Sequence, residues 1–123
     1  MTKEAALQSF FEEFDIDVYA ATAVPEDVAF PWLTYELITG SWEQGEVGIT
    51  VNLWYYTTSE AEPNAKAREM SEAIGFGGTI RECDGGFLWI KRGSPWCQSL
   101  EDATDANIKR RYINISVEFM TLN

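Results

Sequence analysis

Side chains that carry out catalysis in other proteins are scarce in this sequence. It contains no histidine, and its two cysteines, Cys83 and Cys97, lie 14 positions apart. Neither a four-ligand zinc site nor a Cys–His nucleophile can be built from these residues. Because free cysteines in proteins are mostly buried, we expect two reduced thiols that are buried or partly buried.

Carboxylates are the remaining candidates for chemistry. Glu82 and Asp84 lie beside a predicted turn and form the one acidic pair there that could face a cleft. Acid–base catalysis needs two such groups on either side of a bond, whereas acidic residues at turns more often interact with solvent. We therefore expect no enzymatic activity, and a hydrolase that uses this pair is the weakest hypothesis.

The glycine-rich segment Gly75-Phe76-Gly77-Gly78 is the second motif to weigh. A phosphate-binding loop opens a helix and is followed by Lys-Ser or Lys-Thr, but this segment follows a predicted helix and has no such partner. We expect neither a cofactor nor a metal.

The net charge of the chain limits the class of partner that it can bind. The 123 residues include 20 acidic and nine basic ones, for a net charge of -11. This field repels the phosphate backbone, so tight DNA or RNA binding is not expected, although an acidic wall would let a duplex slide past. The longest basic run, Lys109-Arg110-Arg111, alternates sides if it lies on a strand. Two hypotheses stay open for this run: a solubilising sheet edge, or a contact with an acidic loop (Glu101, Asp102, Asp105) of a neighbouring copy.

Tryptophans and tyrosines also occur where no core is expected. Trp42 and Trp96 fall in predicted loops, and Trp54 and Tyr56 fall on the polar side of a predicted strand. Such side chains are enriched at protein interfaces, though they could instead cover the far face of the sheet or cap the core. The candidate subunit or partner contacts are Trp42, Glu43, Trp96, Lys109, Arg110 and Arg111.

The hydrophobic periodicity predicts two helices and several strands within a single domain spanning residues 1–123. The helices are expected over 3–14 and 64–74, and strands over 16–21, 32–38, 48–56, 79–82, 87–91 and 111–122. Residues 92–107 show no periodicity and are expected to form a long surface loop that contacts a partner. The fold class is α+β: an antiparallel or mixed sheet of about five to six strands with both helices packed on one face. No signal peptide or membrane span is expected.

Three segments together resemble a known family. They are Val28-Ala29-Phe30-Pro31-Trp32-Leu33-Thr34-Tyr35-Glu36-Leu37, Val51-Asn52-Leu53-Trp54-Tyr55-Tyr56 and Arg111-Tyr112-Ile113-Asn114-Ile115-Ser116-Val117-Glu118-Phe119. With the N-terminal helix before them, their order and the chain length resemble the tail terminator, or tail completion, proteins of long-tailed bacteriophages, often labelled minor capsid proteins.

The resemblance implies a structural viral protein without an active site. Proteins of that family form a ring, generally a homohexamer, that caps the growing tail tube and presents a surface to the head-side connector. The implied partners are other copies of the chain, the major tail tube protein and the connector, with DNA passing through the lumen unbound. The implied location is the tail or neck of the virion, after assembly in the host bacterial cytoplasm.

A small bacterial domain that holds a ligand between sheet and helices is the alternative. It predicts an enclosed apolar pocket of several hundred Å³.

Overall fold

A computed structural model of the protein describes residues 1–37, 42 and 45–121. The elements along the chain are α1 (Lys3–Glu12), β1 (Asp17–Ala20), β2 (Trp32–Leu37), β3 (Glu46–Tyr56), α2 (Ala61–Ile74), β4 (Thr79–Cys83), β5 (Gly86–Glu101) and β6 (Ile108–Thr121). The six strands form one sheet in the order β1-β2-β3-β6-β5-β4.

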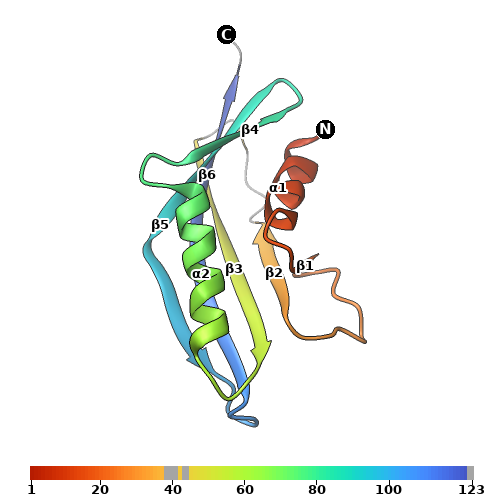
Figure 1. The fold of residues 1–123 in the computed structure, drawn as a ribbon. Coiled ribbons are helices and arrows are strands. Elements are labelled where there is room, and N and C mark those ends of the chain that lie inside the picture. Colours follow the sequence, from red (N-terminus) through yellow and green to blue (C-terminus); the bar gives the residue numbers. More distant parts are fainter. Residues whose placement is uncertain (38–41, 43–44, 122–123) are drawn as a thin grey trace.

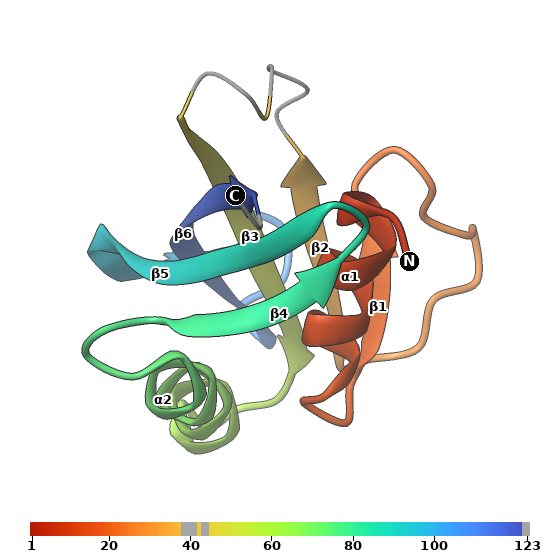
Figure 2. The same ribbon diagram turned by 90° about the horizontal axis from the view of Figure 1, so that it is seen from above.

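The sheet is mixed and curled. β1 pairs with β2 in parallel, and the other four neighbouring pairs are antiparallel. Both helices lie on the same side of it, α2 in front of β3 and β6, and α1 beside β1 and β4 (Figures 1 and 2). The α+β fold class, with a six-stranded mixed sheet and two helices on one face, is therefore confirmed.

Helix α1 begins where its sequence predicts. The Thr2 hydroxyl accepts a hydrogen bond from the Ala5 amide at 3.0 Å, which satisfies one of the free N–H groups at the start of the helix. Its apolar stripe turns Phe10 and Phe11 into the core, where neither is exposed. The chain then reverses through Asp15, which has a φ of 53°.

Helix α1 also bridges the two edges of the curled sheet (Figure 2). On one side, the Gln8 amide donates to the carbonyl of Val18 in β1 at 3.4 Å. On the other, the Arg81 guanidinium of β4 donates two hydrogen bonds to the Glu13 carboxylate, at 2.9 and 2.8 Å. The helix therefore holds together strands that lie at opposite ends of the strand order.

The core lies between the helices and the concave face of the sheet. Alternate residues of the long strands supply it, because successive side chains of a strand point to opposite faces. Leu33, Leu53, Ile113 and Leu88, each on a different strand, have no exposed surface. Met70 adds to the core from α2 and is likewise unexposed. The alternation predicted for these strands is the pattern that the structure uses.

The predicted loop over residues 92–107 is wrong for residues 92–101, and the loop covers only residues 102–107. Strand β5 continues to Glu101 and pairs with β6 from Cys97, opposite Ile113, to Glu101, opposite Lys109. The register shifts between Arg92 and Cys97, so the alternation of the strand is interrupted there. This bulge removed the periodicity from which a continuous strand would be predicted.

None of the helices in the described part of the chain is both long enough and apolar enough to cross a membrane.

Candidate interaction surface

The face of the sheet opposite the helices carries the candidate site. Aromatic side chains from three strands and the segment before β2 gather there with one arginine. We call this group the aromatic face; it consists of Tyr19, Phe30, Trp32, Trp54, Tyr56 and Arg110. These strand residues alternate with buried neighbours, and so they project away from the core.

A stack across three strands forms the centre of the aromatic face. Trp32 of β2 lies opposite Trp54 of β3, and their rings stack at 5.1 Å with an angle of 10° between planes. Arg110 of β6 lies opposite Trp54 on the other side and places its guanidinium 5.1 Å from that ring. Stacked aromatic pairs and cation–π contacts each contribute about 0.5–1.5 kcal/mol beyond area burial. The strand register therefore brings these three side chains into one stacked row across the sheet.

Two further aromatic contacts extend this stack to the margin of the sheet. Tyr19 of β1 and Phe30 both meet the Trp32 ring edge-on, with centroids 6.4 Å away. Phe30 also contacts Tyr56 at 5.7 Å. Phe30 is 39% exposed and Tyr56 is 55% exposed, so large apolar surface remains in contact with solvent.

Several polar atoms on this side of the sheet lack hydrogen-bond partners. Trp54 Nε1 donates to Thr34 Oγ1 at 3.2 Å. Trp32 Nε1, Asn52 Oδ1 and Arg110 Nε, in contrast, are buried and have no partner among the described residues. A buried polar group left unpaired costs about 1–3 kcal/mol. The composition of the aromatic face is typical of a binding surface, since Trp, Tyr and Arg dominate the energetics of protein interfaces.

The two predicted contact tryptophans are elsewhere. Trp42 and Trp96 are half-buried and pack against the core, and Trp96 lies within β5 instead of in a loop. Their positions agree with the alternative that loop aromatics cap the core. Glu43 lies outside the described residues.

The basic run alternates sides as predicted. Arg111 points into the molecule and is 2% exposed, and it donates hydrogen bonds to Glu60 and to Asn64 Oδ1. Lys109, on the same side, donates to the carbonyl of Ala106 at 2.6 Å, whereas Arg110 belongs to the aromatic face. Because β6 lies between β3 and β5, the interpretation of this run as a solubilising sheet edge is wrong.

The acidic pair and the glycine-rich segment have structural partners. Asp84 Oδ1 accepts from the N-terminal ammonium at 2.9 Å, while Glu82 is exposed. The carbonyl of Gly77 accepts from Trp89 Nε1 at 2.9 Å, so this segment packs onto β5. Its Phe76 is 99% exposed.

The cysteines match the sequence expectation. Cys83 and Cys97 are free and half-buried, and burial raises the pKa of both thiols. A raised pKa leaves less thiolate at neutral pH and lowers reactivity. Within the described residues, no three acidic or sulfur side chains are grouped so that they could hold a metal.

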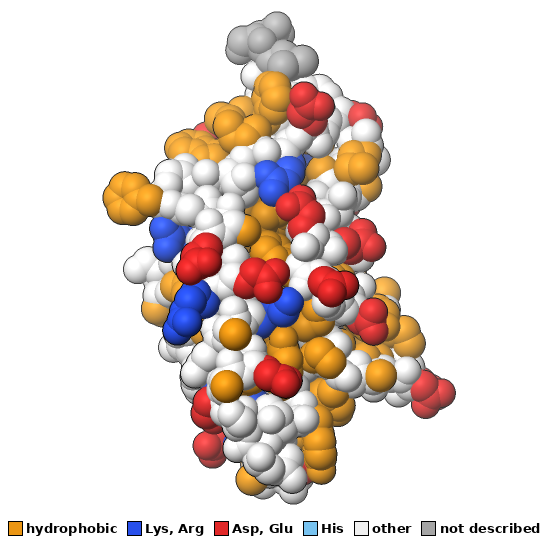
Figure 3. Space-filling view, in the orientation of Figure 1, with side chains coloured by type: hydrophobic (Ala, Val, Ile, Leu, Met, Phe, Trp, Pro, Cys, Tyr) orange, Lys and Arg blue, Asp and Glu red, His pale blue; other side chains and the backbone are white. Residues whose placement is uncertain are grey.

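Charge on the surface is mainly acidic because the chain has 20 acidic residues against nine basic ones, and several of the basic side chains bind carboxylates or carbonyls of the same chain. Arg81 binds Glu13, Lys91 binds Glu46, and Lys66 binds the Phe14 carbonyl and Glu69. Figure 3 shows carboxylates spread over the helix-bearing side, with basic side chains between them.

Comparison of the sequence with protein-family models and with curated proteins gives no match.

Three members of the aromatic face were not predicted from the sequence. Trp54 and Tyr56 were recognised by their place on the polar side of a strand, but Tyr19, Phe30 and Trp32 were not. The parallel register that sets Tyr19 beside Trp32 comes from the tertiary fold, and no local pattern in the sequence indicates it.

Proposed function

We propose that this protein is a structural subunit of bacteriophage tail assembly, of the tail terminator or tail completion type. Copies of the chain associate into a ring, generally of six, that caps the tail tube and joins it to the head-side connector. Its partners are then itself, the major tail tube protein and the connector protein. It works in the tail or neck of the virion, after assembly in the bacterial cytoplasm.

The aromatic face is the observation that carries this proposal. It is a cluster of aromatic rings in mutual contact, with exposed apolar area at Phe30 and Tyr56. Such a surface offers a protein partner hydrophobic anchors. A subunit whose work is assembly needs this kind of surface.

The order of elements gives further support. Along the chain come a short N-terminal helix, β1, the strand β2 that follows Pro31, its antiparallel partner β3, a second helix, the strands β4 and β5, and a long last strand. This is the layout that the sequence resemblance implies.

The charge distribution is consistent with DNA passing through a ring without binding. The net charge is -11, and the run Lys109–Arg111 makes its contacts within the same chain. DNA-binding proteins instead present basic side chains to the phosphates.

The structure gives less support to the two alternative functions, a ligand-binding domain and a hydrolase. Two hollows, of about 470 and 350 Å³, open at the surface beside β1, and carboxylates line both, whereas a ligand-binding domain would enclose an apolar pocket between sheet and helices. A hydrolase that uses Glu82 and Asp84 would need both carboxyl groups free to act, but Asp84 binds the N-terminus.

The test is assembly with the major tail tube protein of the same phage. Light scattering of the mixture should show a ring, about 83 kDa for six copies of the 13.9 kDa chain, and electron microscopy should show it at the tube end. A monomer both alone and with tube protein, together with normal tail lengths when the gene is deleted, would contradict the proposal.

A matched pair of variants tests the aromatic face itself. Phe30→Ser with Tyr56→Ser removes exposed apolar area from this face and should abolish ring assembly while the chain stays folded. Ile80→Ser removes a side chain of similar exposure, 52%, from β4 at the other end of the strand order and should leave assembly intact. Equal assembly by both variants would exclude the aromatic face as the contact.

A further inference from the structure

Phe76 projects into solvent from the loop between α2 and β4. Its side chain is 99% exposed, more than any other large apolar side chain among the residues that the structure describes. It belongs neither to the core nor to the aromatic face. Aromatic side chains are enriched at the centre of protein interfaces, where they are buried by a partner. Phe76 is therefore a candidate anchor for a partner.

The backbone on both sides of Phe76 is held in place by β5. Arg92 Nε donates a hydrogen bond to the Gly75 carbonyl at 3.1 Å. On the other side, Trp89 Nε1 donates to the Gly77 carbonyl at 2.9 Å. The exposed ring is thus carried by a loop that is already ordered, so little conformational entropy is lost when a partner covers it.

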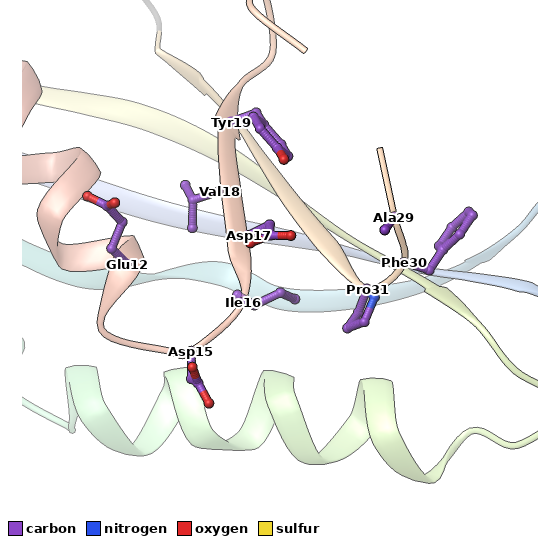
Figure 4. A pocket seen from close by; sticks show the side chains of 9 residues that line it. All are labelled: Glu12, Asp15, Ile16, Asp17, Val18, Tyr19, Ala29, Phe30 and Pro31. Carbon is purple, nitrogen blue, oxygen red and sulfur yellow. The ribbon is translucent and has the colours of Figure 1, made fainter. Parts of the chain in front are cut away.

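The second of the two surface hollows, of about 350 Å³, lies against one flank of α2. Its lining is apolar at Ile16, Pro31, Tyr55 and Ala65, and charged at Asp15, Glu62, Lys66 and Glu69. Figure 4 shows Ile16 and Pro31 next to each other above α2, with Asp15 pointing toward the helix. We call this site the α2 hollow.

The base of the α2 hollow is a buried tyrosine. Tyr55 is 5% exposed, and the other lining residues are half-buried or exposed. Burial is the main cause that raises the pKa of Tyr55 to about 12, and the charges of Glu62 and Glu69 add to it. Pockets that hold small ligands begin at about 300 Å³, so the α2 hollow has room for a single phenyl ring.

Phe76 and the α2 hollow lie on opposite flanks of α2. The helix residues of the hollow have the spacing of one helix face, namely Glu62, Ala65, Lys66 and Glu69. Ser71, on the opposite flank, accepts from Arg92 of β5, which also holds the loop of Phe76. Between Ala65 and Ile74 the helix advances about 14 Å. The ring of Phe76 therefore cannot enter the hollow of its own chain.

The two flanks of α2 also differ in charge. Three carboxylates and one lysine surround the hollow: Asp15, Glu62, Glu69 and Lys66. Arg68 and Arg92 are exposed on the flank of Phe76, with Glu72 beside Arg68, and neither arginine forms an ion pair with a described carboxylate. One flank is therefore basic on balance and the other acidic, so two copies attract each other when unlike flanks meet.

We propose that Phe76 of one copy of the chain inserts into the α2 hollow of a neighbouring copy. The ring lies against the apolar lining, and Arg68 and Arg92 face the carboxylates of the rim. Because this contact joins two different surfaces, each bound copy still offers one free ring and one free hollow, and repetition produces a closed ring or a filament.

This inference rests on the proposed function in one respect, the association of copies of the chain, for which it names a specific contact. The α2 hollow also adjoins the aromatic face, because Pro31 of its lining directly follows Phe30. An exposed phenylalanine can enter a lipid surface instead, but the net charge of -11 opposes approach to anionic headgroups.

Two variants, each at an exposed position, disable opposite halves of the contact. Phe76→Ser removes the ring and keeps the hollow, whereas Ala65→Trp fills the hollow and keeps the ring. An isotope-labelled Phe76→Ser chain is titrated at millimolar concentration with unlabelled Ala65→Trp chain and followed by NMR. The amides of Ile16, Ala65 and Lys66 should shift, and the complex should stop at two copies, since neither chain can extend it.

Matched controls separate this contact from general association. An unlabelled chain with both substitutions should bind the labelled chain at least about tenfold more weakly, because it has no ring to insert. Combining Phe76→Leu with Ala65→Trp restores an apolar side chain and should restore the shifts. In the labelled chain, Ala73→Trp adds the same bulk to an exposed site of α2 outside the hollow and should leave binding unchanged.

The outcomes distinguish this contact from the tail-assembly role. Absence of shifts, or equal shifts from a chain without the ring, would overturn the contact even if the parent chain assembles on tail tubes. Flotation of the parent chain with phosphatidylserine vesicles, lost in Phe76→Ser, would overturn it in favour of a lipid surface. Shifts as expected, without any assembly on tail tubes, would support the contact and contradict the tail-assembly role.

Discussion

At the scale of single residues, Arg111 shows that a member of the basic run Lys109–Arg111 stabilises the fold. Its guanidinium lies on the core side of β6 with a side chain 3% exposed, and it is held by Glu60 and by two hydrogen bonds to Asn64 Oδ1, at 3.1 and 2.8 Å. The cost of burying this charge is offset only while both partners remain. Arg111 therefore ties the start of α2 to the middle of the sheet.

Replacing Glu60 by glutamine tests this arrangement. The variant Glu60→Gln keeps the length of the side chain and an acceptor but removes the negative charge, so the buried guanidinium retains only neutral partners. Bonds to charged partners exceed neutral ones by about 1 kcal/mol, and we expect a loss of that order in the free energy of unfolding, measured in urea. Glu62→Gln, which removes an unpaired exposed carboxylate nearby, should change stability little.

The pH dependence of the same pair has a definite sign. The hydrogen bond from Arg111 is the main cause that lowers the pKa of Glu60 in the folded chain, and the charges of Arg111 and Lys109 act in the same direction. A carboxylate with a lowered pKa stabilises the fold above its ordinary pKa, and this contribution is lost as pH falls through the lowered value. The difference between the parent chain and Glu60→Gln should therefore disappear in acid; a difference that persisted at low pH would show that the charge is not its cause.

At the scale of elements, the pairing of β5 with β6 explains both a success and a failure of sequence interpretation. Residues 87–91 and 111–122 keep a strict alternation and were predicted as strands. Residues 97–101 also form a strand, but the bulge after Arg92 shifts their alternation relative to residues 87–91. A pattern with one insertion looks irregular to any method that reads a fixed period, so the extension of β5 was predicted as a loop.

The first residue of β5 gives the element-scale prediction. A Cβ added to Gly86 would lie 1.9 Å from the Met120 carbonyl oxygen and 2.9 Å from its carbon, both backbone atoms of β6. The strands would have to separate there, so Gly86→Ala should lower the free energy of unfolding by about 1–3 kcal/mol. Urea unfolding followed by circular dichroism would measure it.

Gly77→Ala is the matched control for this change. A Cβ at Gly77 would meet nothing within 4 Å, and the residue lies in the turn before the same hairpin. We expect its stability to stay within about 0.5 kcal/mol of the parent chain. Equal losses at Gly77 and Gly86 would mean that the close approach of β5 to β6 does not set the cost.

At the scale of the whole molecule, the sequence predicted the layers of the fold but little of its surface. Alternation along strands is a local signal, so the buried face of each strand could be assigned from residues such as Leu53 and Ile113. The aromatic face combines residues distant in sequence, as when Trp32, Trp54 and Arg110 stack across three strands. Strand order and register produce such combinations, and composition alone does not encode them.

The net charge of the molecule predicts how its stability depends on salt. With 20 acidic residues against nine basic ones, repulsion among unpaired carboxylates opposes the folded state at neutral pH. Salt screens this repulsion more than it weakens the few close ion pairs, so the melting temperature should rise from about 10 to 300 mM sodium chloride. A fall over this range would mean that the ion pairs of Arg81, Lys91 and Arg111 outweigh the repulsion.

Lowering the pH should distinguish the repulsion among unpaired carboxylates from the stabilising ion pairs. Lowering the pH from 7 toward the ordinary pKa of glutamate begins to protonate unpaired carboxylates and relieves their repulsion, so stability should first increase. Hydrogen bonds lower the pKa of Glu13, Glu46, Glu60 and Asp102, from Arg81, Lys91, Arg111 and Thr104 respectively. These four carboxylates stabilise the folded chain above their ordinary pKa, and that stability is lost only as pH falls through the lowered values. Melting temperatures measured from pH 8 to pH 2 should therefore pass through a maximum on the acid side of neutrality. The maximum should flatten in high salt, because screening removes the repulsion that produces its rising limb.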